Sequence, residues 1–208
     1  MSEAMLVRGY VLAGGASSRF GTDKALAELQ GETMLERSTK LLAKVTSSVK
    51  IVSPVVKLNR GDYDTISDRW PGEGPLGGIL TALVDAKNQT GEGAAALVVS
   101  CDMPFLTPEW LRFLAARASE SGAEAVVPKS AQGWEPLCAC WLASAAEIVL
   151  PLFEAGTRKI TEALNVLHVE VLDEKDWKRF DLNGRLFWNM NTAADYEEAR
   201  RMLAAEEP

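Results

Sequence analysis

The chain has 208 residues and a formal net charge of −7 at pH 7, with 47% hydrophobic and 25% charged residues. These proportions are typical of a soluble globular protein and exclude a disordered or fibrous chain. No apolar run approaches the ~20 residues that a membrane-spanning helix needs, and no secretory signal is recognisable, so we expect a cytoplasmic protein with no membrane partner. The acidic balance also argues against nucleic acid as a partner.

The sequence holds three cysteines, Cys101, Cys138 and Cys140, and one histidine, His168. Three cysteines are an odd and small number for a disulfide framework, and one histidine leaves no credible His/Cys zinc set. We therefore interpret the cysteines as small, half-buried hydrophobic residues of a reducing cytosol, and His168 as a structural residue.

Short apolar runs alternate with amphipathic stretches along the first part of the chain. Strands are predicted at 10–13, 49–52, 95–100 and 124–128, and helices at 33–43, 75–86 and 107–121. The helix at 107–121 has a clear start, since Thr107 can cap it, Pro108 suits its first position and Glu109 lies in its first turn. The alternation of strands and helices predicts a parallel sheet covered on both faces.

The second half of the chain is less regular. Two strands joined by a turn at 131–133 are predicted within 125–141, then helices at 143–154 and 159–167, a strand at 168–172, and a helix from 192 to about 204. No linker or repeat marks a second domain. We therefore predict one domain over residues 1–208 with an α/β fold, a three-layer, mostly parallel, Rossmann-like sheet with helices on both faces.

The most informative stretch runs from Leu12 to Lys24 (LAGGASSRFGTDK). Gly14 and Gly15, directly after a strand, let backbone N–H groups approach an anion closely. Arg19 and Lys24 bring two cations to this loop of an acidic chain, so it is a candidate polyphosphate site. The spacing excludes a Walker A loop, which needs Gly-Lys-Ser/Thr, and the G-x-G-x-x-G fingerprint of a dinucleotide-binding dehydrogenase.

Asp102 directly follows the third predicted strand, where a carboxylate is costly unless it is solvated, paired or metal-bound. Ligands of parallel sheets bind beyond the carboxyl ends of the strands, which places Asp102 on the same edge as Gly14 and Gly15. Because a carboxylate beside phosphates is an ordinary Mg²⁺ ligand, we predict that Asp102 holds Mg²⁺ against a nucleotide. A turn-capping role for Asp102 is the alternative.

Five motifs in a fixed order carry a resemblance to a known family. They are L-A-G-G-x-S-S-R-F-G-T-D-K at 12–24, G-P-L-G-G-I at 74–79, C-D-M-P-F at 101–105, A-G-T-R-K at 155–159 and N-M-N-T at 189–192. In this combination the chain resembles the molybdenum cofactor guanylyltransferases (MobA family), which belong to the glycosyltransferase-A-like nucleotidyltransferases. The resemblance covers most of the chain.

The resemblance implies an enzyme that transfers GMP from GTP to the phosphate of molybdopterin, giving the guanine dinucleotide form of the cofactor and pyrophosphate. It implies Mg²⁺, or Mn²⁺ in its place, as the metal. The nucleotide would bind within about 6–128 and the acceptor within about 129–208. Transient contact with molybdenum-cofactor handover proteins or apoenzymes is also implied.

The resemblance also assigns roles to individual residues. The guanine and ribose would be bound by backbone groups of Leu12, Ala13 and Gly14. The nucleotide would be bound further by Gly15, by Ser53, where the family often has Asn, and by Asp68. Arg19 and Lys24 would bind the triphosphate and act in catalysis with the metal ligand Asp102. Arg158, Asn189 and Asn191 would face the pterin phosphate. Glu135 precedes Pro136 where the family often has His or Gln.

Two other functions remain open at this point. The first is a cytidylyl- or other nucleotidyltransferase acting on a pterin or sugar phosphate. The second is a GTP-binding protein that delivers the cofactor without catalysis. The presence of Arg19, Lys24 and Asp102 together favours an enzyme, since a pure binding module has less need of a metal carboxylate opposite a triphosphate clamp. A phosphate nucleophile is already ionised, so the expected catalysis consists of positioning and charge stabilisation.

Overall fold

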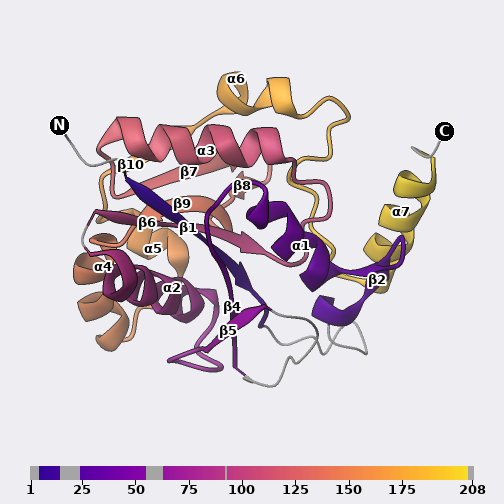
Figure 1. Ribbon diagram of the computed structural model, residues 1–208. Coiled ribbons are helices and arrows are strands. Elements are labelled where there is room, and N and C mark those ends of the chain that lie inside the picture. Colours follow the sequence, from indigo (N-terminus) through magenta and orange to yellow (C-terminus); the bar gives the residue numbers. More distant parts are fainter. Residues whose placement is uncertain (1–4, 15–23, 55–62, 92, 206–208) are drawn as a thin grey trace.

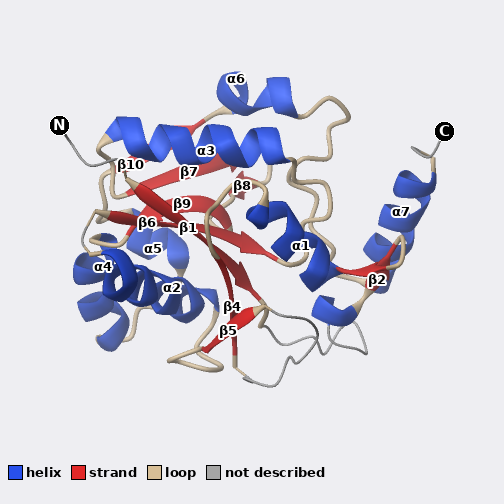
Figure 2. Cartoon of the chain, in the orientation of Figure 1, coloured by secondary structure: helices blue, strands red, loops and turns tan. Residues whose placement is uncertain are grey.

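A central eight-stranded sheet runs through the molecule, and helices cover both of its faces (Figures 1 and 2). The computed structural model describes residues 5–14, 24–54, 63–91 and 93–205. The strand order is β10-β7-β9-β6-β1-β4-β5, and β8 pairs only with β7. The predicted single α/β sheet is confirmed, because β1, β4, β5 and β6 pair in parallel, as do β7 and β10, and only β8 and β9 are antiparallel to their neighbours.

The strands of this sheet are β1 (Leu6–Leu12), β4 (Val49–Ser53), β5 (Asp64–Ser67), β6 (Ala94–Ser100), β7 (Ala125–Ser130), β8 (Gly133–Trp134), β9 (Cys138–Leu142) and β10 (Val169–Leu172). A separate hairpin holds β2 (Glu28–Leu29) and β3 (Glu32–Thr33). The helices are α1 (Met34–Ala43), α2 (Pro75–Thr90), α3 (Pro108–Ser121), α4 (Ala145–Glu154), α5 (Ile160–Leu164), α6 (Glu174–Trp177) and α7 (Ala193–Ala204), with 3-10 turns at Lys24–Leu26 and Lys178–Phe180.

The central strands of the sheet are buried on both faces, so alternate residues of one strand enter two different cores. Tyr10 and Leu12 of β1 pack in the core that holds α2, α4 and α5, whereas Val11 packs in the core that holds α1 and α3. The second core also contains Cys138 and Cys140, and burial raises the pKa of each thiol to about 12. The cysteines are therefore small hydrophobic residues, more deeply buried than the sequence predicts, because β9 lies inside the sheet.

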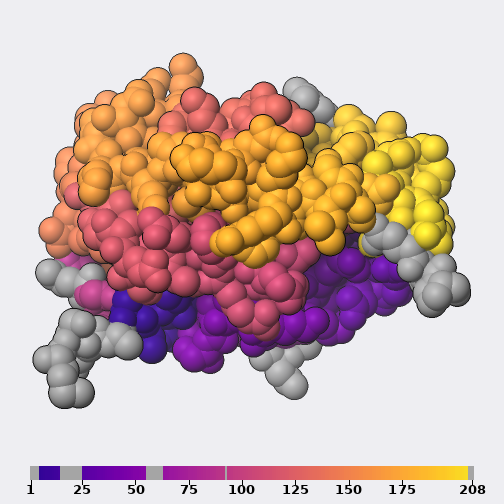
Figure 3. Space-filling model, turned by 90° about the horizontal axis from the view of Figure 1, so that it is seen from above, coloured from indigo at the N-terminus to yellow at the C-terminus, as the bar shows by residue number. Residues whose placement is uncertain are grey.

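A third, smaller cluster lies away from the sheet, where α7 packs against the hairpin of β2 and β3. Its fully buried members include Met34 and Met190, and the Tyr196 hydroxyl donates to the Glu28 carbonyl over 2.6 Å. In the space-filling view the C-terminal helix, in yellow, forms one end of the molecule (Figure 3).

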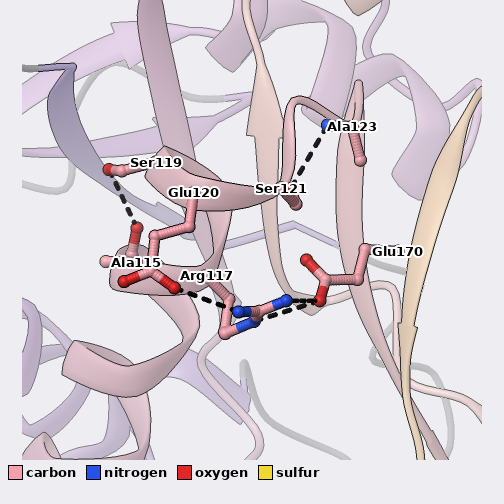
Figure 4. A network of polar contacts seen from close by, with 7 residues as sticks. All are labelled: Ala115, Arg117, Ser119, Glu120, Ser121, Ala123 and Glu170. Carbon is pink, nitrogen blue, oxygen red and sulfur yellow. Dashed lines mark hydrogen bonds and ion pairs between the residues drawn. The ribbon is translucent and has the colours of Figure 1, made fainter.

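Helix α3 is also tied to the edge of the sheet (Figure 4). Arg117 of α3 donates through Nε to Oε1 of Glu170 on β10 over 3.0 Å, and its Nη1 pairs with Glu120 over 3.0 Å. These contacts add to the main-chain bonds that join β10 to β7.

The helix starts follow the sequence prediction closely. The Thr107 hydroxyl accepts from the Trp110 N–H, and Thr192 forms a capping box with Asp195. Such a cap stabilises a helix by about 1 kcal/mol, because it satisfies an N–H that the helix itself leaves without a partner. No helix within the described ranges is long and apolar enough to cross a bilayer.

Four predicted features need correction. The sequence does not predict β5, since it is a short edge strand with no fully buried residue. Because β5 precedes β6, the strand that leads to Asp102 is the fourth of the parallel group along the chain, not the third. The stretch at 125–141 holds three strands instead of two, because the expected turn joins β7 to the short strand β8, and a second turn then leads to β9. α5 ends at Leu164 instead of 167, and α2 continues to Thr90.

Candidate active site

The carboxyl ends of the parallel strands bring the conspicuous loops to one edge of the sheet. Leu12 of β1 lies in register with Ser100 of β6, so Gly14 and Asp102, each two residues further on, leave the sheet at the same edge. β4 and β5 end at this edge as well, where Ser53 pairs with Ser67. This is the edge at which ligands of such sheets bind.

A cleft of about 590 Å³ opens at this edge. It is lined by Leu12, Gly14, Val52, Pro54, Asp68, Gly72, Gly74, Pro75, Gly78, Ser100 and Leu137. Most of these residues present apolar atoms or backbone, and Asp68 supplies a carboxylate. An apolar cleft with a few polar groups is typical of a small-molecule site.

Two glycines of this cleft lie very close to neighbouring side chains. A Cβ on Gly14 would lie 3.1 Å from Cδ of Pro54, and a Cβ on Gly78 would lie 3.3 Å from Cδ1 of Leu12. Gly78 therefore lets α2 approach Leu12 at the end of β1, and Gly14 lets the chain after β1 approach Pro54 after β4.

Asp68 is held in place by hydrogen bonds that the sequence does not predict. Its Oδ1 accepts from the Trp70 N–H over 3.0 Å and from the Thr81 hydroxyl over 3.0 Å, while its own N–H donates to the Ser53 carbonyl over 2.8 Å. Among the described residues Oδ2 has no hydrogen-bond partner. One carboxylate oxygen is thus used to hold the residue, and the other can accept from a ligand.

Two residues assigned to the nucleotide lie beneath the cleft instead of lining it. Ser53 is buried, and its carbonyl holds Asp68. Ala13 is also buried, and its N–H donates to the Val52 carbonyl over 2.9 Å. Both positions support the residues that line the cleft.

Asp102 lies beside a segment from the far end of the chain. Its carbonyl accepts from the Met190 N–H over 2.9 Å, which brings Asn189 and Asn191 close to it. The Asn189 side chain donates to the Phe187 carbonyl over 3.2 Å. The structure therefore brings Asn189 and Asn191 close to Asp102, although both lie almost ninety positions further along the sequence.

Arg158 lies beside the loop that follows Asp68. It occupies the turn between α4 and α5, and its Nε donates to Oε2 of Glu73 over 2.6 Å, in the loop that leads into α2. Its guanidinium carbon lies 4.0 Å from the centre of the Phe153 ring. The structure thus places Arg158 next to Gly72 and Gly74, in a different neighbourhood from the asparagine pair.

Part of the glycine-rich loop falls outside the description of the structure. Gly15 and Arg19 lie beyond the described residues, and for Lys24 only the backbone, in a 3-10 turn, is described. Their predicted phosphate contacts stay predictions.

The structure contains a carboxylate that could bind Mg²⁺, but the described residues do not form a complete set of protein ligands for a metal ion. No group of three or more His, Cys, Asp or Glu side chains that could hold a metal alone occurs in the described ranges. Mg²⁺ in phosphate chemistry is usually bound by one or two carboxylates, with phosphate oxygens and water as the other ligands. Asp102, partly exposed at the end of β6, suits that donor set.

Several residues of the cleft carried no individual prediction. Gly74, Pro75 and Gly78 belong to the G-P-L-G-G-I motif, so a signal existed, but the motif does not say which positions face the cleft. Leu137 carried no signal, because it lies in the turn between β8 and β9 and reaches the cleft only through the pairing of β9 in the sheet. Near it, Glu135 accepts from the Ser130 hydroxyl over 2.6 Å, and burial raises the pKa of its carboxyl.

Comparison with known proteins places this geometry in a family. The family profile of the MobA-like NTP transferase domain matches residues 9–169. A protein of Pelotomaculum thermopropionicum named "Probable molybdenum cofactor guanylyltransferase" is 33% identical over 196 residues, which is 93% of this chain and 92% of that protein. The molybdenum cofactor guanylyltransferase of Desulfosudis oleivorans is 30% identical over 202 residues, 96% of each chain.

A solved structure agrees with the sequence relatives. The crystal structure of molybdopterin-guanine dinucleotide biosynthesis protein A from Archaeoglobus fulgidus superposes with a TM-score of 0.82 at 28% identity, over 95% of this chain and 99% of that one. The relatives and the solved structure match nearly the full length of the chain, and the family profile covers residues 9–169. The chain therefore belongs to the MobA-like NTP transferase family.

Proposed function

We propose that this protein transfers GMP from GTP to the terminal phosphate of molybdopterin, forming the guanine dinucleotide form of the cofactor and releasing pyrophosphate. The observation that carries the proposal is the cleft at the carboxyl ends of the parallel strands, which Asp68 lines, with Asp102 following β6 at the same edge of the sheet. The chain also matches guanylyltransferases over nearly its full length.

The reaction is one nucleotidyl transfer. An oxygen of the molybdopterin phosphate forms a bond to the α-phosphorus of GTP, and the bond from that phosphorus to the bridging oxygen of the β-phosphate breaks, so pyrophosphate leaves with the electron pair. The attacking oxygen is ionised at neutral pH, and no general base is required. The residues must bring the two phosphates together and stabilise charge.

The residues of the cleft suit the nucleoside. Leu12 and Gly14 offer an apolar surface and accessible backbone, and the second oxygen of Asp68 can accept from a hydroxyl or amine. We assign the triphosphate to Gly15, Arg19 and Lys24, whose donors and charges would stabilise the departing pyrophosphate.

Asp102 would hold Mg²⁺, which when bound neutralises charge on the phosphates of the nucleotide. Asn189 and Asn191 lie beside Asp102. Their side-chain amides would offer donors and acceptors to the acceptor phosphate. The acceptor-binding part would thus lie within about 129–208, although Leu137 from that part also lines the nucleotide cleft.

The proposal includes a cytosolic place of action and transient contacts with proteins that supply or receive the cofactor. The three cysteines are buried and none of them forms a disulfide, which agrees with a reducing compartment.

Titration calorimetry of the protein with GTP, CTP, ATP and UTP in the presence of Mg²⁺ tests the nucleotide. Selective binding of GTP, followed by pyrophosphate release when molybdopterin is added, is the expected result. Selective binding of CTP would replace the guanylyl assignment with the cytidylyl one. GTP binding without pyrophosphate release in the presence of molybdopterin would favour a delivery protein over an enzyme.

A further inference from the structure

The loop Trp70–Gly74 leads from Asp68 into α2 and forms part of the cleft. Gly72 and Gly74 of this loop line the cleft directly. Their φ angles of 85° and 88° are ones that residues other than glycine rarely adopt. Glycine backbone loses the most conformational freedom when it is ordered, so this loop needs contacts that hold it in one shape.

The start of the loop is held by the main core. The Trp70 N–H donates to Asp68, and the Trp70 ring packs on the ring of Phe153 with centroids 5.4 Å apart. Phe153, at the end of α4, is buried. A Cβ on Gly77 would lie 3.2 Å from Cβ of Trp70, so α2 also confines the tryptophan.

The far part of the loop is held by Arg158. Glu73 stands between the two glycines that line the cleft, and its carboxylate accepts from Nε of Arg158 over 2.6 Å. The same guanidinium donates through Nη1 to the carbonyls of Phe153 and Thr157, at 2.5 and 2.9 Å, and lies over the Phe153 ring. Arg158 is therefore anchored on the end of α4 before it reaches the loop.

We propose that Arg158 is a positioning residue for the nucleotide: through its ion pair with Glu73 and its stacking on Phe153 it holds the Trp70–Gly74 loop in the shape that completes the cleft. The inference deepens the proposed function and rests on it, since the nucleotide is taken to occupy this cleft. It gives Arg158 a role that differs from the contact with the pterin phosphate implied by the resemblance.

An ordinary stabilising role explains the ion pair less well. Arg158 and Glu73 are 40% and 49% exposed, and ion pairs at that exposure add little to folding stability. A contact that keeps a glycine-rich loop ordered has its effect on ligand binding instead, because the loop then loses less entropy when a ligand binds against it.

The test compares two ion pairs of the same chain. Arg158→Met and Glu73→Gln are each expected to weaken GTP binding about five-fold in calorimetry. The double variant is expected to bind no more weakly than the weaker single variant, since both changes break one contact. The KM for molybdopterin should stay within about two-fold of the wild-type value, because Arg158 acts here on the nucleotide.

The matched control is the exposed pair Lys87–Glu147, which joins α2 to α4 away from the cleft. Lys87→Met and Glu147→Gln are expected to leave GTP affinity unchanged. Arg158→Lys should restore part of the lost affinity, because it keeps the charge but loses the planar stack. Since the pair is exposed, the ratio of wild-type to Arg158→Met affinity should shrink when salt is raised from about 0.05 to about 0.5 M.

The outcomes separate this inference from the function on which it rests. Wild-type binding of GTP with unchanged affinity in Arg158→Met and Glu73→Gln would overturn the positioning role and leave the proposed function intact. A raised KM for molybdopterin with unchanged GTP affinity would return Arg158 to the acceptor side. A wild-type protein that binds no nucleotide would overturn both. If Arg158→Met does not fold, Glu73→Gln alone still decides, because its side chain is half exposed and packs in no core.

Discussion

The two sides of the candidate active site are held in place in different ways. The side that we call the nucleotide wall, formed by Leu12, Asp68, Gly72, Gly74 and Gly78, rests on the main core and on side chains within α2 and α4. The other side, which we call the acceptor wall, is formed by Asp102 and residues 189–191. Residues 189–191 follow all strands of the sheet, and Met190 among them packs in the small third cluster. The nucleotide wall therefore shares the stability of the core, whereas the acceptor wall depends on the docking of α7.

The largest expected effect separates chemistry from binding at the acceptor wall. Asp102→Asn keeps the size of the side chain but removes the charge that would hold Mg²⁺, so turnover should fall about 100- to 1,000-fold. GTP affinity should change by less than about three-fold, since the nucleotide wall is intact. Pyrophosphate release and calorimetry measure the two quantities. Near-normal turnover would remove Asp102 from the metal site.

A core substitution tests whether the acceptor wall depends on α7. Met190 is fully buried in the third cluster, and Met190→Ala should lower the free energy of unfolding by about 2–4 kcal/mol. Turnover should fall more than GTP affinity, because the altered segment carries Asn189 and Asn191. Urea unfolding and steady-state kinetics provide the measurements. Equal losses of turnover and of GTP affinity would mean that the two walls are not independent.

The nucleotide wall has a smaller and more local test. Thr81→Val removes the hydroxyl that donates to Asp68 and keeps the shape of the side chain, so GTP should bind about five-fold more weakly. Thr90→Val, in the same helix, is the control, because the Thr90 hydroxyl donates only to the Ala86 carbonyl of its own helix. Unchanged affinity in Thr81→Val would show that Asp68 does not need this support.

The smallest effect concerns pH. Burial raises the pKa of Glu135, so the folded protein binds this proton more tightly than the unfolded chain, and stability falls as pH rises from the ordinary range of a glutamate through the raised pKa. The Glu135→Gln variant does not lose stability in this way. Its free energy of unfolding relative to that of the wild type should therefore increase between about pH 4 and pH 7. Thermal melts at the two pH values measure the change. A constant difference would mean that Glu135 titrates normally.

The sequence predicts most of what is local and little of what is long-range. The cap at Thr107 and the buried run at 95–100 follow from propensity and pattern, because their causes lie within a few residues. Strand β5 is missed, since a short edge strand has little apolar signal. Leu137 in the cleft, and the pairing of Arg158 with Glu73, depend on how distant elements meet, which periodicity does not encode.

The antiparallel strand β9 has a consequence for synthesis of the chain. It lies between β6 and β7 in the sheet although it follows both of them along the sequence. As the chain leaves the ribosome, β6 keeps an open edge and β7 has no partner, because every strand that pairs with β7 is still to come. Open edges are where nascent chains pair wrongly with one another. Until residues 138–142 emerge, the half-made sheet is therefore the stage at which chaperone protection would matter most.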